Sequence, residues 1–519
     1  MFLWRFFYLF KLVFVLLLKR DLTGPVRLRI FFERAGGAFI KFGQILALRQ
    51  DFLPLSYIGE LLKLLNQTSI VPFEKMQVVF AQETGRPVEA FFSEFDSIPI
   101  ASASIAQVYK AKLKDSPRGG AGGTKVAVKI QKPEIREEFE KDFGIILFLA
   151  IVADFFRFYP SFYLQEIVSE FISWTRKELD FTFEAQNAII VHKHSMSHPR
   201  TVVPWQYPAL SSPRVLIQEL IEDGVAVEDL FFGKISSKEL LEKGINNEEM
   251  ANYLVIDQMR QYFIDGFFHA DPHPANLFFL PGNKLVYFDF GIVGRADPQR
   301  LFFLKNLYGV AKKDIDFSAK ALMEFGSKIM EKEIDIYFKR DVKKHQLTLK
   351  IIEKIKELIL TDFKRDLANI LNPWFEALKR PNATLVEKSA AFVFLETVRE
   401  GERHGVRFPK EMTLFFRSLS ILDMIALHIN PNFDIIKVLN LFFEKYPLEE
   451  VERMISENGY AGDLGKKIIS TADVDWESFK EVALLEKERM MQARERVIDL
   501  ITYYAERYEE LRPLIKNYK

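Results

Sequence analysis

The stretch that decides the fold reads His269-Ala270-Asp271-Pro272-His273-Pro274-Ala275-Asn276, and Asp289-Phe290-Gly291 follows after a short strand-like run. A phosphoryl-transfer site needs a carboxylate that accepts a hydroxyl proton or orients the attacking oxygen. It also needs an amide oxygen and a second carboxylate that hold Mg²⁺ against the nucleotide phosphates. Asp271, Asn276 and Asp289 supply these groups in that order. Asp-Phe-Gly alone arises by chance, but the two motifs flanking a predicted β-hairpin together indicate phosphoryl transfer.

A lysine on an upstream strand fits the same chemistry. Residues 125–130 form a β-branched strand in which Lys129 takes the position that holds the α- and β-phosphates in kinases. Further on, Glu178, Asp180 and Glu184 place three carboxylates within seven residues of a predicted apolar helix, where burial requires cations or a metal. They cannot all share one helical face, so we expect more than one partner, and Lys129 is the expected partner of one of them.

Two further segments are predicted to contain strands, and the first of them is expected to bind the nucleotide. Residues 214–224 read as a strand that ends in a polar linker, where backbone groups at Glu219 and Ile221 would bind the adenine edge. The boundary between a small and a large lobe is expected near Asp223. The other segment, residues 101–113, is a small-residue turn that runs into an alternating strand and begins with Ala101, Ser102, Ala103 and Ser104.

The rest of the chain is predicted to be mainly helical. Residues 22–98 read as helices broken at Pro25, Pro54 and Pro72, and within them Lys41 and Gln44 share one helical face. Residues 247–266 read as a helix that leads into the catalytic loop. After Gly291 only a short segment precedes Asp297-Pro298, a favourable helix start, so the long activation segment that presents peptides is missing. This argues against a peptide substrate.

Composition narrows the class of protein. Among 519 residues the 71 Lys and Arg balance the 71 Asp and Glu, so no global field favours nucleic acid. Cysteine is absent, which excludes disulfides, zinc–thiolate sites and thiol nucleophiles. The 50 phenylalanines favour a Phe-rich core, with a membrane surface or an apolar ligand as the alternative use. His192, His194 and His198 lie in a polar segment without a carboxylate between them, so we predict solvated histidines rather than a metal site.

Two apolar segments leave membrane contact open. Residues 2–18 are very apolar, but their uninterrupted run, residues 12–18, is shorter than the roughly 20 residues that span a bilayer. No cleavage site follows, which argues against a secretory signal. An interfacial helix with cations at Arg5, Lys11, Lys19 and Arg20 and a helix packed on its own domain are equally compatible with the pattern. Residues 142–164 are predicted to form a buried helix, with a second membrane-facing surface as the alternative.

Taken together, these motifs resemble the AarF/UbiB (ABC-one/ADCK) family of atypical kinase-like proteins over residues 38–433. The resemblance implies an α+β fold of the two-lobe protein-kinase type, with a helical extension at residues 1–95, an N-lobe at 96–222, a C-lobe at 223–440 and a helical tail at 441–519. It also implies that the alanine-rich loop replaces a glycine-rich one and that Lys129 pairs with Glu184. Asp271 would be the catalytic carboxylate, and Asn276 and Asp289 the metal ligands.

The same resemblance implies how the site is used. Lys41 and Gln44 would lie over the active site near Glu178 and Asp180 and obstruct a protein substrate. ATP and Mg²⁺ are the implied cofactors, and an isoprenoid lipid or quinone precursor is the implied partner, because the family is linked to ubiquinone and related lipids, with ATPase activity better supported than protein phosphorylation. The implied location is the cytoplasm, with peripheral attachment to the inner face of the membrane as an option.

Two departures from the family pattern and two alternative functions accompany this interpretation. The loop ends in Pro274-Ala275-Asn276 where the family usually has Pro-Gly-Asn, and alanine does not adopt a positive φ without cost. The two hydrophobic membrane helices that end many bacterial members are missing.

A nucleotide-gated lipid-binding scaffold with negligible turnover fits the same motifs. A small-molecule kinase of the aminoglycoside-phosphotransferase type fits less well, because it needs neither Lys41 and Gln44 nor the Glu178–Asp180 pair.

Overall fold

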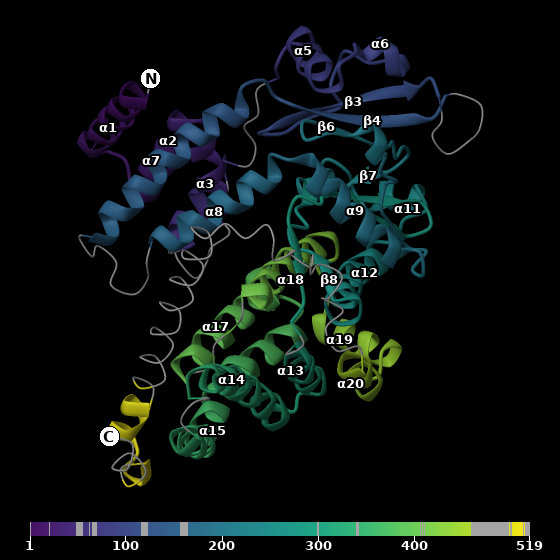
Figure 1. Ribbon diagram of the computed structural model, residues 1–519. Coiled ribbons are helices and arrows are strands. Elements are labelled where there is room, and N and C mark those ends of the chain that lie inside the picture. Colours follow the sequence, from purple (N-terminus) through teal and green to yellow (C-terminus); the bar gives the residue numbers. More distant parts are fainter. Residues whose placement is uncertain are drawn as a thin grey trace. The chain divides into compact units, whose positions relative to one another are not determined.

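The computed structural model divides the chain into two compact units (Figure 1). The first comprises Met1–Val225 and Asn276–Val293, and the second comprises Ala226–Ala275 and Gly294–Lys519. The structure describes residues 2–19, 21–47, 55–61, 63–64, 70–115, 123–155, 164–297, 300–338, 342–404, 406, 408, 410–457, 498, 501–511 and 513. It is a mixture of helices and small sheets with a largely helical C-terminal region, as the sequence predicts.

The first unit contains an antiparallel sheet in the strand order β1-β3-β4-β6, with β2 paired to the outer part of β3. Strand β4 is buried along six of its seven residues, and Val126, Val128 and Ile130 belong to the core that also contains α5. A second small sheet pairs β5 in parallel with β10, and β10 in antiparallel with β9. The strands of this unit are β1 (Phe92–Phe95), β2 (Ala101–Ser102), β3 (Ala106–Leu113), β4 (Lys125–Gln131), β5 (Thr201–Val202), β6 (Val215–Glu219), β9 (Leu277–Leu280) and β10 (Lys284–Tyr287), and β7 (Val225–Ala226) lies at its boundary.

Helices form a separate hydrophobic core in the same unit, in which side chains from α1, α2, α3, α7 and α8 pack together. A second core lies between α5 and the sheet. The helices are α1 (Phe2–Leu18), α2 (Gly24–Ala35), α3 (Gly37–Ala47), α4 (Leu55–Leu61), α5 (Phe73–Thr84), α6 (Val88–Phe91), α7 (Ile135–Phe155), α8 (Leu164–Glu178) and α9 (Phe181–Ser195), with 3₁₀ turns at Pro208–Leu210 and Pro274–Asn276. The breaks predicted at Pro25 and Pro72 are the starts of α2 and α5.

Several sequence predictions about the first unit are wrong in detail. Residues 92–95, expected to end the helical extension, form strand β1, since their register with β3 satisfies the backbone in a sheet. The carboxylates at 178–184 do not share one helix, because the chain breaks between α8 and α9. The apolar segment expected at 142–164 spans the second half of α7, and residues 156–163 lie outside the described part.

Helix α1 has two different faces. Leu9, Leu12 and Leu16 are buried in the helical core, as the packed-helix alternative requires. The opposite face exposes large apolar side chains, as the interfacial alternative requires: Trp4, Phe7, Phe10, Val13, Phe14, Leu17 and Leu18. Arg5 is not a surface cation as predicted, because its guanidinium pairs with the buried Asp142 carboxylate at 2.9 Å and donates to the Ala35 carbonyl. Arg20 lies outside the described residues.

The second unit is almost entirely helical. Its helices are α10 (Val227–Phe231), α11 (Ser237–Glu242), α12 (Asn247–Arg260), α13 (Arg300–Lys312), α14 (Ile315–Phe338), α15 (Val342–Lys379), α16 (Leu385–Lys388), α17 (Ala390–Arg403), α18 (Lys410–Ile429), α19 (Ile435–Lys445) and α20 (Leu448–Glu457), with a π-helical turn at Gln261–Asp265 and a 3₁₀ turn at Glu509–Leu511. Strand β8 (Phe267–His269) pairs with β11 (Val293–Arg295). The helix start expected at Pro298 and much of the predicted tail at 441–519 fall outside the described residues.

Phenylalanine builds much of this interior. The ring of Phe415 on α18 stacks on Tyr262 at 3.9 Å between centroids, and the rings of Phe263, Phe268 and Phe303 surround it. Aromatic rings bury large apolar areas and pair edge-to-face, which explains how a chain so rich in phenylalanine can fold around them. The use predicted from composition, a Phe-rich core, therefore accounts for these residues.

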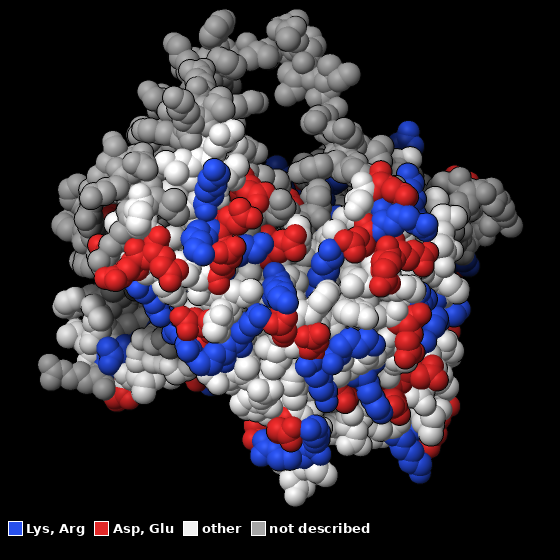
Figure 2. All heavy atoms as spheres, turned by 90° about the horizontal axis from the view of Figure 1, so that it is seen from below, with Lys and Arg blue, Asp and Glu red and all other residues white. Residues whose placement is uncertain are grey.

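One described helix is long and apolar enough to cross a membrane, at Met412–Ile429 on α18. More than half of this segment is buried inside the protein, and α18 packs against α12 and α17. A helix in the core of a protein can have the same length and apolar composition as a membrane-spanning helix. On the face drawn in Figure 2, lysines and arginines alternate with aspartates and glutamates, in keeping with the balanced composition.

Candidate functional site

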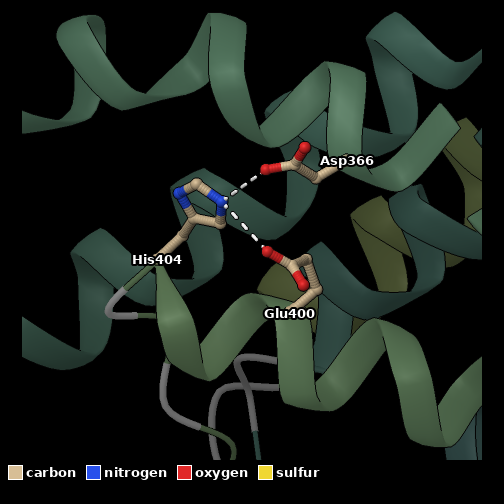
Figure 3. Close-up of side chains that lie close together, drawn as sticks. All are labelled: Asp366, Glu400 and His404. Carbon is tan, nitrogen blue, oxygen red and sulfur yellow. Dashed lines mark hydrogen bonds and ion pairs between the residues drawn. The ribbon is translucent and has the colours of Figure 1, made fainter. Parts of the chain in front are cut away.

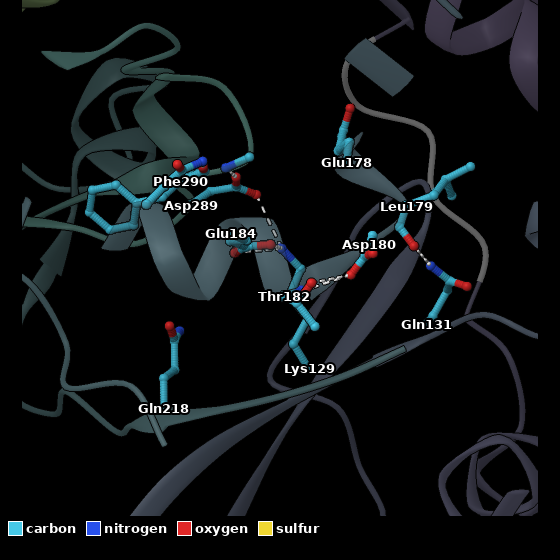
Figure 4. Close-up of polar contacts among 12 residues, drawn as sticks. Lys129, Gln131, Glu178, Leu179, Asp180, Thr182, Glu184, Gln218, Asp289 and Phe290 are labelled. Carbon is cyan, nitrogen blue, oxygen red and sulfur yellow. Dashed lines mark hydrogen bonds and ion pairs between the residues drawn. The ribbon is translucent and has the colours of Figure 1, made fainter. Parts of the chain in front are cut away.

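The centre of the candidate site is the ammonium group of Lys129 on β4 (Figure 4). Its Nζ lies 2.8 Å from Oε2 and 3.0 Å from Oε1 of Glu184 on α9, so the ion pair expected from the sequence is formed. The same Nζ lies 3.2 Å from Oδ2 of Asp289, and the ring of Phe181 adds a cation–π contact. One buried cation therefore holds a carboxylate from a helix and a carboxylate from the Asp-Phe-Gly motif.

Burial decides the electrostatics of this group. The side chains of Lys129 and Glu184 are nearly inaccessible, whereas Asp289 is about one-third exposed (37%). Burial disfavours the charged ammonium, but the negative charges of Asp289 and Glu184 outweigh it, so the pKa of Lys129 is raised and the lysine stays charged. Burial, with Asp289 and Glu178 nearby, raises the pKa of Glu184 above its usual range even though Lys129 opposes the shift.

The hairpin β9–β10 brings the two predicted metal ligands to one end. Leu277 pairs with Tyr287 across the hairpin, and one step further the Phe288 amide donates to the Asn276 carbonyl at 3.0 Å. Asn276 and Asp289 therefore leave the same end of the hairpin. An amide oxygen and a carboxylate are ligands that Mg²⁺ accepts, so this donor set fits the metal. The loop forms a 3₁₀ turn at Pro274–Asn276. Ala275 is not among the described residues with positive φ, so the alanine in place of the family's glycine does not require that conformation here.

Helix α9 also holds the Asp-Phe-Gly motif through a residue that the sequence analysis did not assign. Asn187 donates from Nδ2 to the Phe290 carbonyl at 3.0 Å, and the Phe290 side chain is fully buried. The Gly291 amide donates to Oδ1 of Asp289 at 2.8 Å. The available signal was spacing, since Asn187 stands three residues after Glu184 and so shares its helical face.

The break between α8 and α9 separates the roles of Glu178 and Asp180. Asp180 is the N-cap of α9 and accepts from the Thr182 amide and hydroxyl at 3.0 and 2.6 Å. Glu178 instead accepts from Nζ of Lys41 at 2.6 Å, across 137 residues of sequence. The structure therefore brings Lys41 to the Glu178–Asp180 segment, and that segment reaches α9 and Glu184 within six residues.

Gln44 lies on α3 with Lys41 but does not contact the three carboxylates through any hydrogen bond of the described residues. It donates from Nε2 to the Leu64 carbonyl at 3.0 Å and so fixes the segment that follows α4. Between them Gly43 faces Phe32 and Leu64 so closely that a Cβ would lie 2.7–2.9 Å from their atoms. Gly43 is therefore required for the packing of α3 on α2.

The alanine-rich turn is a tight hairpin between β2 and β3. Ala101 pairs with Val108 and Ser102 with Gln107, and the Ala103 amide donates to the Ala106 carbonyl at 2.8 Å, which encloses Ser104 in the turn. Glu219 ends β6, where its amide donates to the Trp205 carbonyl and its carboxylate accepts from the Trp205 amide. Ile221 follows on the linker that leads to β7.

Asp271 belongs to the second unit, and its surroundings there are well defined. Arg417 on α18 donates to Asp271 Oδ1 at 2.9 Å, a contact across 146 residues that no sequence pattern predicts. The Asp271 amide donates to Nδ1 of His269, so His269 braces the loop through the backbone. Gln258 and Gln261 bond the His269 carbonyl and amide. The loop that carries Asp271 is thus held by side chains from α12, the π turn and α18.

The three histidines at 192, 194 and 198 are not solvated loop residues as predicted, because His192 and His194 lie on α9 and all three side chains are partly buried. His192 hydrogen-bonds the Val203 carbonyl through Nδ1 at 3.0 Å and lies edge-on to Trp205. It shares no metal-binding group with His194 or His198 among the described residues.

The match to a family model defines the class of this chain as a kinase-like protein. The chain belongs to the ABC1 atypical kinase-like family, since residues 63–322 match the ABC1 atypical kinase-like domain. An uncharacterized protein in the hydrogenase 1 5′ region of Clostridium pasteurianum is 30% identical over 444 residues, 84% of this chain and 75% of that protein. The probable protein kinase UbiB of Marinobacter nauticus is 28% identical, covering 81% of this chain and 69% of its own. The solved complex of Rv3197 with erythromycin from Mycobacterium tuberculosis is 28% identical with a TM-score of 0.41, covering 55% of this chain and 69% of that one.

Proposed function

We propose that the protein is an atypical kinase or ATPase that binds ATP with Mg²⁺ and supports the metabolism of ubiquinone or another isoprenoid lipid. The observation that carries the proposal is the position of Lys129, which contacts both Glu184 and Asp289. In phosphoryl transfer such a lysine binds the α- and β-phosphates while a helix glutamate keeps it in place. Asn276 and Asp289, at one end of a hairpin, would hold Mg²⁺, which neutralises charge on the phosphates when bound.

The remaining site residues take roles around this centre in the proposal. The backbone of Ala101, Ser102, Ala103 and Ser104 would cover the phosphates, and the backbone at Glu219 and Ile221 would bind the adenine. Asp271 would orient the attacking oxygen, with Arg417 keeping its carboxylate in position.

Lys41 and Glu178 form the proposed gate. Their ion pair is short at 2.6 Å, and both side chains are largely buried. Only a short segment separates Gly291 from the start of α13 at Arg300, which supports an acceptor other than a peptide. We therefore infer that the acceptor is not a peptide. Lys41→Ala should alter turnover or the ratio of ATP to ADP affinity, and unchanged values of both would remove the gate from the proposal.

Peripheral membrane attachment is the proposed location of this activity, on the inner face of the membrane. The exposed face of α1 presents Trp4, Phe7, Phe10 and Phe14, and Lys11 and Lys19 are exposed beside it. An apolar helix face with cations suits an anionic lipid surface. Phe148 on α7 packs edge-on to Phe6 and is itself half exposed, so it extends the same apolar surface.

The test is phosphate release from ATP with Mg²⁺, with and without liposomes that contain cardiolipin, and with Asp289→Asn as the blank. Turnover that rises with liposomes and disappears in Asp289→Asn would support a membrane-tuned kinase or ATPase. Nucleotide binding without turnover would favour a nucleotide-gated lipid-binding scaffold, a reading supported by the ion pairs that already engage Asp271 and Asp289. The absence of both binding and turnover would overturn the proposal.

A further inference from the structure

A second group of metal-binding side chains lies in the second unit, where three residues from two helices meet (Figure 3). Asp366 lies on α15, Glu400 lies on α17, and His404 is the residue that caps the C-terminal end of α17. Nε2 of His404 lies 3.1 Å from Oδ2 of Asp366 and 3.3 Å from Oε1 of Glu400. Among the described residues this is the one group of three whose ligand atoms all lie within 4.8 Å of one another.

These separations match a metal site better than a loose acidic surface. A tetrahedral Zn²⁺ with bonds of about 2.0–2.2 Å places its ligand atoms roughly 3.3–3.6 Å apart. The two measured separations from Nε2 are 3.1 and 3.3 Å, so little movement would bring all three ligand atoms around one ion.

Neighbouring side chains orient the two carboxylates toward His404. Arg365 donates to Oδ1 of Asp366 at 3.3 Å, which leaves Oδ2 as the oxygen that faces Nε2. Arg403 donates to Oε2 of Glu400 at 2.9 Å, which leaves Oε1 facing the same nitrogen. Outer hydrogen bonds that fix ligand orientation in this way are a regular feature of metal sites.

The surroundings also restrict the ring while keeping a route for an ion. The His404 side chain is buried, and the Phe363 ring lies 5.3 Å from it at a steep angle. The carboxylates of Asp366 and Glu400 are partly exposed, at 27% and 15%. An ion can therefore enter from the side of Asp366, and three protein ligands leave a fourth position for water.

We propose that Asp366, Glu400 and His404 bind a divalent transition-metal ion, with Zn²⁺ the best match, that joins α15 to α17. This site is separate from the proposed Mg²⁺ ligands in residue identity and in ligand type, because imidazole nitrogen favours Zn²⁺ over Mg²⁺. The competing arrangement of the same geometry is a single proton on Nε2 of His404 that is donated between the two carboxylates without a metal.

The test is a Zn²⁺ titration of the full chain against a chromophoric chelator, without nucleotide and in an Asp289→Asn background that removes the proposed Mg²⁺ ligand. We expect one equivalent of Zn²⁺, with affinity reduced by at least about tenfold in His404→Ala and in Glu400→Gln. Glu396→Gln is the matched control, since Glu396 lies on the same helix and pairs with Arg399 as Glu400 pairs with Arg403. Its Zn²⁺ affinity should equal that of the Asp289→Asn parent.

A second measurement separates binding from folding defects. Zn²⁺ should raise the melting temperature of the parent and of Glu396→Gln, but not that of Glu400→Gln, which keeps the size of the side chain. Mg²⁺ at the same concentration should not reproduce the shift. Absence of a one-equivalent Zn²⁺ site in the parent, or equal affinity in Glu400→Gln and the parent, would overturn the proposal and leave His404 as the proton-bearing partner.

Discussion

At the scale of single residues, Lys129 shows how a buried charge depends on its neighbours. The ammonium is compensated by two carboxylates that arrive from α9 and from the Asp-Phe-Gly motif. Burial favours the neutral form of Glu184, and the Lys129 ammonium opposes this effect. The residue types could be read from the sequence, but the burial that gives them their properties could not.

Removal of this cation should destabilise the first unit. Lys129→Ala leaves Glu184 and Asp289 facing one another, and we expect the free energy of unfolding to fall by about 2–4 kcal/mol. Urea denaturation followed by circular dichroism measures the change. Lys125→Ala is the control on the same strand, because its side chain is mostly exposed, and its midpoint should stay unchanged. If Lys129→Ala behaves like Lys125→Ala, the buried triad does not contribute as described.

Asp423 on α18 provides a pH prediction. Burial raises its pKa to about 7, although its carboxylate accepts from the Ser389 hydroxyl at 2.7 Å and the Ala390 amide at 2.9 Å. Because the folded state binds this proton more tightly than the unfolded chain, the stability it contributes is present below pH 4 and is lost as the pH rises toward 7.

The Asp423→Asn variant should remove this dependence. Its side-chain oxygen can still accept from Ser389 and Ala390, and it carries no charge. We expect the variant to exceed the wild type in unfolding free energy at pH 8 by an amount on the order of 1–3 kcal/mol, and the difference to shrink at pH 5. Denaturant titrations at the two pH values measure it. Parallel pH profiles would show that Asp423 does not hold its proton in the folded state.

At the scale of elements, local sequence patterns predicted the strands and hairpins whose formation depends on residues close together in the chain. The strand expected at 125–130 is β4, and the hairpin expected between the two motifs is β9–β10. Residues 92–95 were mistaken for helix because Phe-Phe-Ser-Glu-Phe fits both periods over so few residues, and only the pairing with β3 decides between them. The break between α8 and α9 was missed because Asp180 works as a cap only once its helix begins at Phe181.

The packing of α3 gives a prediction at this scale. In Gly43→Ala the added methyl would lie 2.7 Å from Leu64 and 2.8 Å from Phe32, so we expect a loss of about 1–3 kcal/mol in unfolding free energy. Gly59→Ala on α4 is the matched control, because no atom lies within 4 Å of its added Cβ. That control should be neutral or slightly stabilising, since alanine favours helix over glycine. Equal stability of the two variants would contradict the close packing of α3.

At the scale of the whole molecule, the two faces of α1 bear on folding and on the proposed membrane contact. Its buried leucines hold it in the helical core, while its aromatic face remains exposed. A combined Phe7→Ser, Phe10→Ser and Phe14→Ser variant should bind cardiolipin-containing liposomes at least about fivefold more weakly in a sedimentation assay, with its fold retained, because the lost apolar area lies outside the core.

The control for this variant removes apolar side chains of similar exposure elsewhere. Phe232→Ser, Leu241→Ser and Val386→Ser lie on other helices or their ends, so their combination should leave liposome binding unchanged. If both triple variants sediment alike, the exposed face of α1 does not form the membrane contact, and general hydrophobicity would explain any binding.

The sequence by itself determined which chemical groups are present and how close they lie along the chain: the Asp271–Asn276 loop, Asp289 after a hairpin, and a strand lysine. These motifs depend on local spacing, which the sequence shows directly as a period of two residues in strands and 3.6 residues in helices. The tertiary structure alone decided the contacts Arg5–Asp142, Lys41–Glu178, Asp271–Arg417 and Asp366–His404. Each joins groups far apart in sequence, where no periodicity acts. Burial then sets whether a charge is compensated, and burial exists only after the elements have packed.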